Sequence, residues 1–195
     1  MPQPSKILAF AGSLRAQSFN KKLVRIAAAG ATGAGAQITV IDLRDYALPI
    51  FDEDLEASGG LPANARKLKD LFLAHQGLLI SSPEYNSSVS AALKNTIDWI
   101  SRPVPNGGEA PLQCFDGKVA GLMSASPGAL GGLRGLVHIR AILGNIKVLV
   151  LPEQVAVSKA HEAFTPEGAL KDAKQQAAVE GLGARVAAVL AKLNA

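Results

Sequence analysis

Residues 6–20 read KILAFAGSLRAQSFN, an apolar run followed directly by a polar loop that opens with glycine. The apolar run Lys6–Ala11 has the length and composition of a strand buried on both faces. Gly12 allows the chain to leave that strand sharply. A helix is predicted over residues 20–29, capped by its first residue and stopped by Gly30. This strand–loop–helix unit is typical of α/β proteins.

Four more apolar runs have the length of strands, and helical patterns separate them. The strands are expected at Gln37–Leu43, Gly77–Ser81, Lys118–Met123 and Lys147–Leu151. Helices are expected over 62–75, 91–101, 133–143 and 167–193, with residues 44–61 irregular and 103–111 rich in turns. Strands alternating with helices form a parallel sheet covered on both faces, and right-handed crossovers leave only doubly wound orders. For five strands we predict the order 2-1-3-4-5, in a single domain over residues 1–195.

The composition excludes several classes of protein. Of the 195 residues, 48% are hydrophobic and 18% are charged, which is a globular balance and not that of a disordered chain. The net charge of +4 includes no basic stripe, and aromatic residues make up only 5%, so nucleic-acid binding is not expected. Cys114 is the single cysteine, which fits a reducing compartment. With no signal core and no apolar run of about 18 residues, we predict a cytoplasmic protein without membrane insertion.

Ligands of doubly wound sheets bind beyond the carboxyl ends of the strands, where the strand order reverses. The first loop at that place contains Gly12, Ser13, Arg15, Ser18 and Asn20. Its hydroxyl and amide groups, together with the backbone N–H groups at a helix start, favour a phosphate, and the arginine adds a positive fork. The alternative is a plain helix cap with a surface arginine.

Two further loops reach the same edge of the sheet. The loop after the third strand contains Pro83, Glu84, Tyr85 and Asn86, with a flat ring and polar groups suited to the edge of a planar ligand. Glu84 alone could be a general base, but no neighbouring acid or base is visible to work with it. The loop after the fourth strand, residues 124–132, is rich in small residues that let a ligand approach the backbone. The alternative for both loops is a simple turn.

Other chemistries find little support in the sequence. No G-x-G-x-x-G follows the first strand, and no Walker loop or G-x-S-x-G motif occurs. His75, His138 and His161 are scattered, so no metal site is expected. Cys114 lies in a proline-rich stretch and is predicted to be a passive thiol. We therefore assign no catalytic side chain.

Three segments together resemble a known family, the NADPH-dependent FMN reductases of flavodoxin-like fold, which include bacterial quinone and chromate reductases. The segments are GSLRAQSFNKKL (12–23), PEYNSSVSAALKNTIDWISRP (83–103) and SPGALGG (126–132). The resemblance spans nearly the whole chain in matching order. It implies a flavodoxin-like doubly wound α/β fold, FMN as the cofactor, and NADPH or NADH as the electron donor. Hydride would pass to FMN and then to a small acceptor such as a quinone, chromate, an azo or nitro compound, or free flavin.

The resemblance also implies which residues hold FMN. Those near the phosphate would be Gly12, Ser13, Arg15, Ser18, Phe19 and Asn20. Those bordering the flavin ring would be Pro83, Glu84, Tyr85 and Asn86, with Ser126 and Gly128 from the third loop. The chain departs from the family at Ser90-Ala91, where Pro-Gly is usual, and this leaves the ring-edge contacts open.

Two other functions compete with this reading. A flavodoxin-type electron carrier would bind FMN without its own reductase activity, but carriers tend to be acidic. A flavin-free regulator of receiver type would need an acidic cluster after the first strand, and Ala11-Gly12-Ser13 has none.

We also expect a homodimer or homotetramer. Leu93, Ile97, Trp99 and Ile100 cover more of their helix than one core-facing stripe needs, and the surplus suggests burial against a second subunit.

Overall fold

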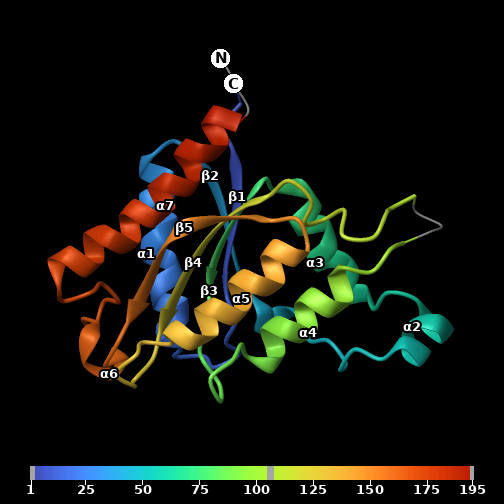
Figure 1. The fold of residues 1–195 in the computed structure, drawn as a ribbon, viewed down its shortest axis with the longest axis horizontal. Helices are drawn as coiled ribbons and strands as arrows, with labels where there is room; N and C mark the ends of the chain where they lie inside the picture. The colour runs from blue at the N-terminus through green and yellow to red at the C-terminus, as the bar shows by residue number, and fades with distance from the viewer. Residues whose placement is uncertain (1–2, 105–107, 194–195) are drawn as a thin grey trace.

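The computed structural model describes residues 3–104 and 108–193, and its centre is a five-stranded parallel sheet in the order β2-β1-β3-β4-β5 (Figure 1). The strands are β1 (Lys6–Ala11), β2 (Gln37–Asp42), β3 (Gly77–Ser81), β4 (Val119–Ala125) and β5 (Leu149–Val157). The predicted topology is confirmed. The three inner strands are buried throughout apart from Lys6, because helices cover both faces of the sheet.

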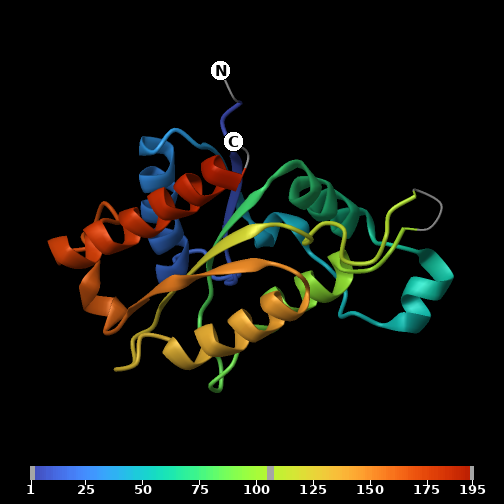
Figure 2. The same cartoon turned by 45° about the horizontal axis from the view of Figure 1, so that its top comes forward.

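The helices form two layers, which Figures 1 and 2 show on opposite faces of the sheet. One layer contains α1 (Phe19–Gly33) and α7 (Ala173–Leu193), which share one apolar cluster with the sheet. The other contains α3 (Ala63–Ala74), α4 (Ala91–Ile100) and α5 (Leu133–Asn145), which share a second cluster. The carboxyl ends of β1, β3 and β4 therefore open between the two layers, at the lower end of the sheet in Figure 1.

The first helix differs from its prediction at both ends. Its N-cap is Ser18, whose Oγ accepts the Asn20 N–H at 3.2 Å, so the helix begins one residue before the predicted cap. It also continues past Gly30 to Gly33. Gly30 lies inside the helix, where the missing side chain allows α7 to pack closely against α1. A Cβ at Gly30 would lie 2.0 Å from the Glu180 carbonyl oxygen of α7.

Residues 44–61 are more regular than predicted. They include the end of the 3₁₀ turn η1 (Leu43–Tyr46) and the short helix α2 (Glu53–Gly59). Asp52 caps α2, since its Oδ1 accepts the N–H of Asp54 at 2.8 Å and of Leu55 at 3.4 Å. Local capping thus forms a helix where the apolar pattern shows none.

The C-terminal part also differs from the prediction. β5 extends to Val157, through Pro152, which lies in an edge strand where a missing N–H is tolerated. The predicted helix over 167–193 is shorter, since α7 starts at Ala173 and the four-residue helix α6 (Ala160–Ala163) precedes it. Gly168, at φ 96°, adopts a backbone conformation incompatible with a helix start at residue 167.

The surplus apolar face of α4 is covered within the same chain. Trp99 is fully buried, its Nε1 donates to the Pro49 carbonyl at 2.8 Å, and its ring meets Phe51 edge-on at 5.0 Å between centroids. Asn95 fastens the same segment, donating to Pro49 O and accepting the Phe51 N–H, both at 2.8 Å. The expectation that Trp99 faces a second subunit is wrong, because residues 49–51 pack over it.

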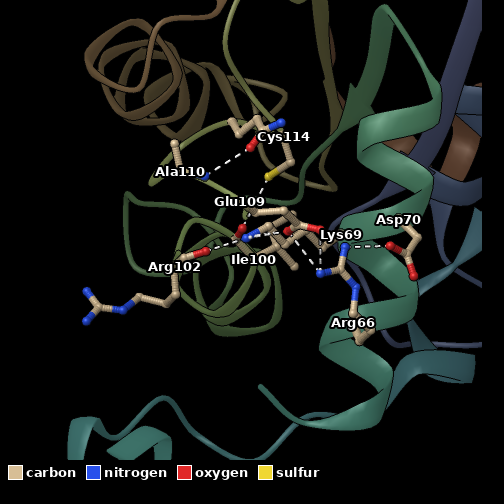
Figure 3. A network of polar contacts seen from close by, with 9 residues as sticks. Arg66, Lys69, Asp70, Ile100, Arg102, Glu109, Ala110 and Cys114 are labelled. Carbon is tan, nitrogen blue, oxygen red and sulfur yellow. Dashed lines mark hydrogen bonds and ion pairs between the residues drawn. The ribbon is translucent and has the colours of Figure 1, made fainter. Parts of the chain in front are cut away.

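A polar network fastens the connection after α4 to α3 (Figure 3). Glu109 bonds to Arg66 at 2.8 Å and to the fully buried Lys69 at 3.1 Å. The Lys69 ammonium also donates to the Arg102 carbonyl, while the Arg102 guanidinium points away and pairs with Glu56 of α2 at 2.8 Å. These pairs hold the predicted turn-rich stretch 103–111 at both sides of residues 105–107, which lie outside the described part of the chain.

Candidate functional site

The three predicted loops converge on one cavity of about 240 Å³ beyond the carboxyl ends of β1, β3 and β4. Its lining residues are Ser13, Arg15, Ser18, Phe19, Pro83, Glu84, Tyr85, Ala125, Ser126 and Pro127. Four predicted site residues lie outside this lining, namely Gly12, Asn20, Asn86 and Gly128. The cavity arises because parallel strands end at the same edge of the sheet, so loops from distant parts of the sequence meet there.

The first loop presents polar groups at the start of α1. Ser13 and Ser18 are buried, and their hydroxyls accept the N–H of Arg15 at 3.3 Å and of Asn20 at 3.2 Å. The Arg15 guanidinium lies over the Phe19 ring, 5.0 Å from its centroid. The N-terminus of a helix, two hydroxyls and a cation form a donor set suited to a phosphate.

Asn20 connects this loop to the ends of two strands. Its Oδ1 accepts the Ser81 hydroxyl at 2.8 Å and the Ala125 N–H at 2.9 Å. Its Nδ2 donates to the Ala125 carbonyl at 2.9 Å. Asn20 is 3% exposed, and its side-chain hydrogen bonds join the start of α1 to the carboxyl ends of β3 and β4. Its predicted contact with the phosphate stays a prediction.

Gly12 lets α4 approach the first loop closely. A Cβ at this position would lie 3.1 Å from Leu93 Cβ and 3.3 Å from Ser90 Oγ. Ser90 is the N-cap of α4: its Oγ accepts the Leu93 N–H at 3.2 Å and donates to the Gly12 carbonyl. Ser90, where the family usually has proline, therefore joins the first loop to the second. A serine just before the predicted start of a helix indicates an N-cap. The sequence does not show that the same serine also bonds to the Gly12 carbonyl.

The second loop ends in a two-residue hairpin turn. Tyr85 and Ser88 exchange backbone hydrogen bonds at 2.9 and 3.0 Å, and Asn86 and Ser87 between them have positive φ values of 50° and 66°. Non-glycine residues adopt this conformation at a cost, which asparagine bears better than most residues. The turn leaves the Tyr85 side chain about half exposed, at 53%, beside the cavity.

Glu84 is held by the N-terminus of α5 and by Arg134. Its Oε2 accepts the N–H of Arg134 at 3.0 Å and of Gly135 at 3.2 Å, and its Oε1 lies 2.5 Å from the Arg134 guanidinium. Burial opposes its ionisation, but these donors outweigh burial and keep the pKa of Glu84 below its ordinary value. A carboxylate with a lowered pKa and occupied oxygens is poorly suited to act as a general base.

The third loop is a tight turn of small residues. The Gly128 N–H donates to Ser126 Oγ at 3.3 Å, and its carbonyl accepts the Gly131 N–H at 3.2 Å. Gly131 has φ 62°, and a Cβ there would lie 2.8 Å from the backbone of Val157. Glycine is required at this position, because the turn lies directly against the end of β5.

Comparison with known proteins shows the family to which this chain belongs. The sequence model of a family described as NADPH-dependent FMN reductase matches residues 5–162. The chain belongs to this family. An NAD(P)H-dependent FMN reductase of Pseudomonas aeruginosa is 35% identical over 181 residues, covering 92% of each chain. A quinone reductase of Escherichia coli strain K12 is 32% identical over 151 residues, covering 77% of this chain and 76% of its own.

A solved structure is also similar to this FMN reductase. The NAD(P)H:acceptor oxidoreductase flavoenzyme of Paracoccus denitrificans superposes with a TM-score of 0.79 at 27% identity, covering 96% of this chain and 98% of its own. The flavodoxin-like fold is thus confirmed. The chain is an FMN-dependent oxidoreductase that uses NAD(P)H, and the alternative of an electron carrier without reductase activity is set aside.

The residues present fit FMN as the cofactor of this reductase. The donor set of the first loop suits its phosphate, and the second and third loops flank the space where a flat ring would extend. When bound, FMN supplies the redox chemistry, namely the acceptance of hydride and the release of electrons. The chain has to bind and orient the ring, which explains why no acid–base pair lines the cavity.

Two other reactive side chains, His75 and Cys114, lie in the interior of the reductase. His75 is bonded through its two ring nitrogens to the Leu71 carbonyl at 2.6 Å and the Thr39 hydroxyl at 2.8 Å. Burial raises the pKa of the Cys114 thiol to about 11, so it stays protonated and unreactive at neutral pH.

Within residues 3–104 and 108–193, no group of three or more His, Cys, Asp or Glu residues could hold a metal ion. In the same ranges, no helix has both the length and the apolar character to cross a membrane.

Proposed function

We propose that this FMN reductase transfers electrons from NAD(P)H to small aromatic or quinone-like acceptors, with both substrates using the same cavity in turn. The observation that carries the proposal is the form of that cavity. The first loop contributes a phosphate-type donor set to its lining, and the second loop contributes the half-exposed Tyr85. Because the two substrates would use the cavity in turn, this reaction requires only one access route to the flavin ring.

The proposed roles of the residues follow from their places. Ser13, Ser18 and Arg15 would hold the FMN phosphate together with the N–H of Phe19 at the start of α1, and Asn20, whose own N–H is bonded to Ser18, would support the loop from the next position. Gly12 would allow the loop its close approach to α4. The flavin ring would lie along Pro83, Glu84, Tyr85 and Asn86, with Ser126 and Gly128 facing it from the third loop. Backbone groups supply most of these ring contacts, since Glu84 is occupied by α5.

Quinones are the first acceptors to test. The Escherichia coli relative is named a quinone reductase, and an aromatic side chain at the cavity mouth suits a flat acceptor. Azo and nitro compounds, chromate and free flavin belong to the same proposal, because an open site over one reactive ring discriminates weakly among acceptors.

The visible spectrum of the purified protein tests this function. We expect a flavin spectrum that bleaches with NADPH or NADH under anaerobic conditions and returns when benzoquinone is added. The extracted cofactor should be FMN, since the first loop provides for one terminal phosphate. Recovery of FAD, or no flavin binding after reconstitution with excess FMN, would show that the site has been assigned wrongly.

A homodimer or homotetramer remains part of the proposal, although Trp99 no longer supports it. Another apolar surface near the cavity is available: Leu130, Leu133 and Val137 are 51%, 41% and 59% exposed. Light scattering at micromolar concentration should give a mass of about 40 or 80 kDa from the 20.2 kDa chain. A stable mass near 20 kDa with full activity would contradict this expectation.

A cytoplasmic location also remains a proposal. The single cysteine, buried and protonated, is consistent with a reducing compartment, where disulfides are rare. Fractionation of cells that express the protein at natural levels would test it.

A further inference from the structure

A second, larger cavity lies beside the flavin cavity, on the other side of the first loop. It has a volume of about 430 Å³ and is formed by residues 14–16, by residues 43, 44 and 46–48, and by α4. Arg15 lines both cavities, so they adjoin at its side chain. None of the roles described above uses this second cavity, which we call the η1 cleft.

The η1 cleft combines an apolar wall with a cation. Leu14, Leu43 and Leu48 line it together with the half-buried ring of Tyr46. Arg44 is exposed in the same lining. A cavity of this size, mostly apolar with a few convergent polar groups, suits a nucleoside, since a planar base packs against apolar and aromatic side chains.

Arg44 is available to an anion. Its guanidinium enters no ion pair among the described residues. Asp42, which does not line the cleft, is bonded to Lys21 at 2.5 Å and accepts the Arg44 N–H at 3.0 Å. Burial opposes its ionisation, but these bonds and the charges of Lys21 and Arg44 keep the pKa of Asp42 below its ordinary value, so its carboxylate is already satisfied. Asp45 is exposed and does not line the cleft. Arg15, the other cation of the cleft, is engaged with Phe19 on the flavin side.

We propose that the η1 cleft binds the adenosine end of NADPH and that Arg44 contacts its 2′-phosphate. This inference rests on the proposed function, because the nicotinamide end must reach the flavin cavity across Arg15. An arginine fork matches the geometry of a phosphate, and NADH lacks the group that Arg44 would contact. Arg44 is therefore the residue that makes this reductase prefer NADPH to NADH.

The kinetic test compares the two donors in matched variants. For Arg44→Ala, the ratio of kcat/KM for NADPH to kcat/KM for NADH should fall by about tenfold, the usual effect of losing a charge-assisted hydrogen bond. Arg44→Glu should lower the ratio further, because it adds repulsion. Arg25→Ala is the matched control: it removes the same charge from an exposed position on α1 outside the cleft, and the ratio should not change.

A binding test is independent of turnover. Calorimetry on the FMN-loaded protein should show binding of adenosine 2′,5′-bisphosphate that is stronger than binding of 5′-AMP, and Arg44→Ala should abolish the difference. Equal use of NADPH and NADH by the unaltered protein would overturn the inference and leave the proposed function intact. A preference for NADPH that survives Arg44→Ala would overturn it as well. If neither donor bleaches the flavin, the proposed function itself fails.

Discussion

Arg15 is the cation that the first loop presents to the cavity proposed for FMN, and its contribution can be measured directly. Arg15→Ala should weaken FMN binding by about 1–3 kcal/mol, since one charge-assisted contact to the phosphate is lost. Titration of the apoprotein with FMN, followed by flavin fluorescence, gives the dissociation constant. Arg25→Ala controls for net charge, because it lies on α1 outside the cavity lining. An unchanged dissociation constant in Arg15→Ala would show that this arginine is only a surface residue.

Glu84 acts on stability through α5, and its effect should depend on pH. Its pKa is lowered in the folded protein, so its carboxylate stabilises the fold above the ordinary pKa of 4.5, and this contribution disappears as the pH falls through the folded value. Glu84→Gln should therefore lower the free energy of unfolding by about 1–2 kcal/mol at neutral pH and by less in acid.

Urea unfolding at neutral pH and at a pH of about 3 measures this difference. Glu153→Gln is the control, because Glu153 and its partner Arg185 are about half exposed and 3.3 Å apart. Exposed pairs of this kind contribute little. A Glu84→Gln effect that stays constant with pH would mean that the carboxylate charge is not what holds the second loop.

At the scale of elements, α1 and α7 are in contact through glycines. A Cβ on Gly183 of α7 would lie 1.8 Å from the Ala27 carbonyl oxygen of α1, and a Cβ on Gly30 would lie 2.0 Å from Glu180 O. Gly183→Ala should destabilise the protein by more than about 2 kcal/mol, because two helix backbones would have to move apart. Gly181→Ala, two residues away with nothing within 4 Å, should be neutral or slightly stabilising.

Thermal unfolding of these two variants tests the contact. If Gly183→Ala melts at the temperature of the unaltered protein, the two helices do not pack as closely as the structure describes. The comparison is sharp because both glycines belong to the same helix and undergo the same substitution, so helix propensity cancels.

The inner strands were easier to predict from the sequence than the ends of the helices. The inner strands could be predicted within two residues at each end, because a buried strand in a parallel sheet is an uninterrupted apolar run. The predicted end of α1 at Gly30 was wrong, because a glycine that ends a helix and a glycine that admits a neighbouring helix look alike in one sequence. α2 was missed because its stability depends on a local Asp52 cap and on Arg102, which is distant in the sequence.

At the scale of the whole molecule, the proposed function has one cavity serve two substrates. Donor and acceptor should therefore occupy it in turn, and steady-state kinetics with NADPH and a quinone should give parallel double-reciprocal lines. The measurement varies one substrate at several fixed concentrations of the other. Intersecting lines, with kinetic evidence for a ternary complex, would contradict a shared cavity.

The sequence by itself determined the sheet, its strand order and the three loops that carry the site. Apolar runs and glycines mark strands and turns locally, and the rule that crossovers are right-handed leaves few strand orders, so these features are readable without coordinates. Only the tertiary structure decided what each side chain contacts. Asn20 bonds to Ala125, and Glu84 bonds to the start of α5, across separations of 105 and about 50 residues. Trp99 is covered by residues 49–51 and not by a partner, because an apolar helix face shows that it must be buried but not what buries it.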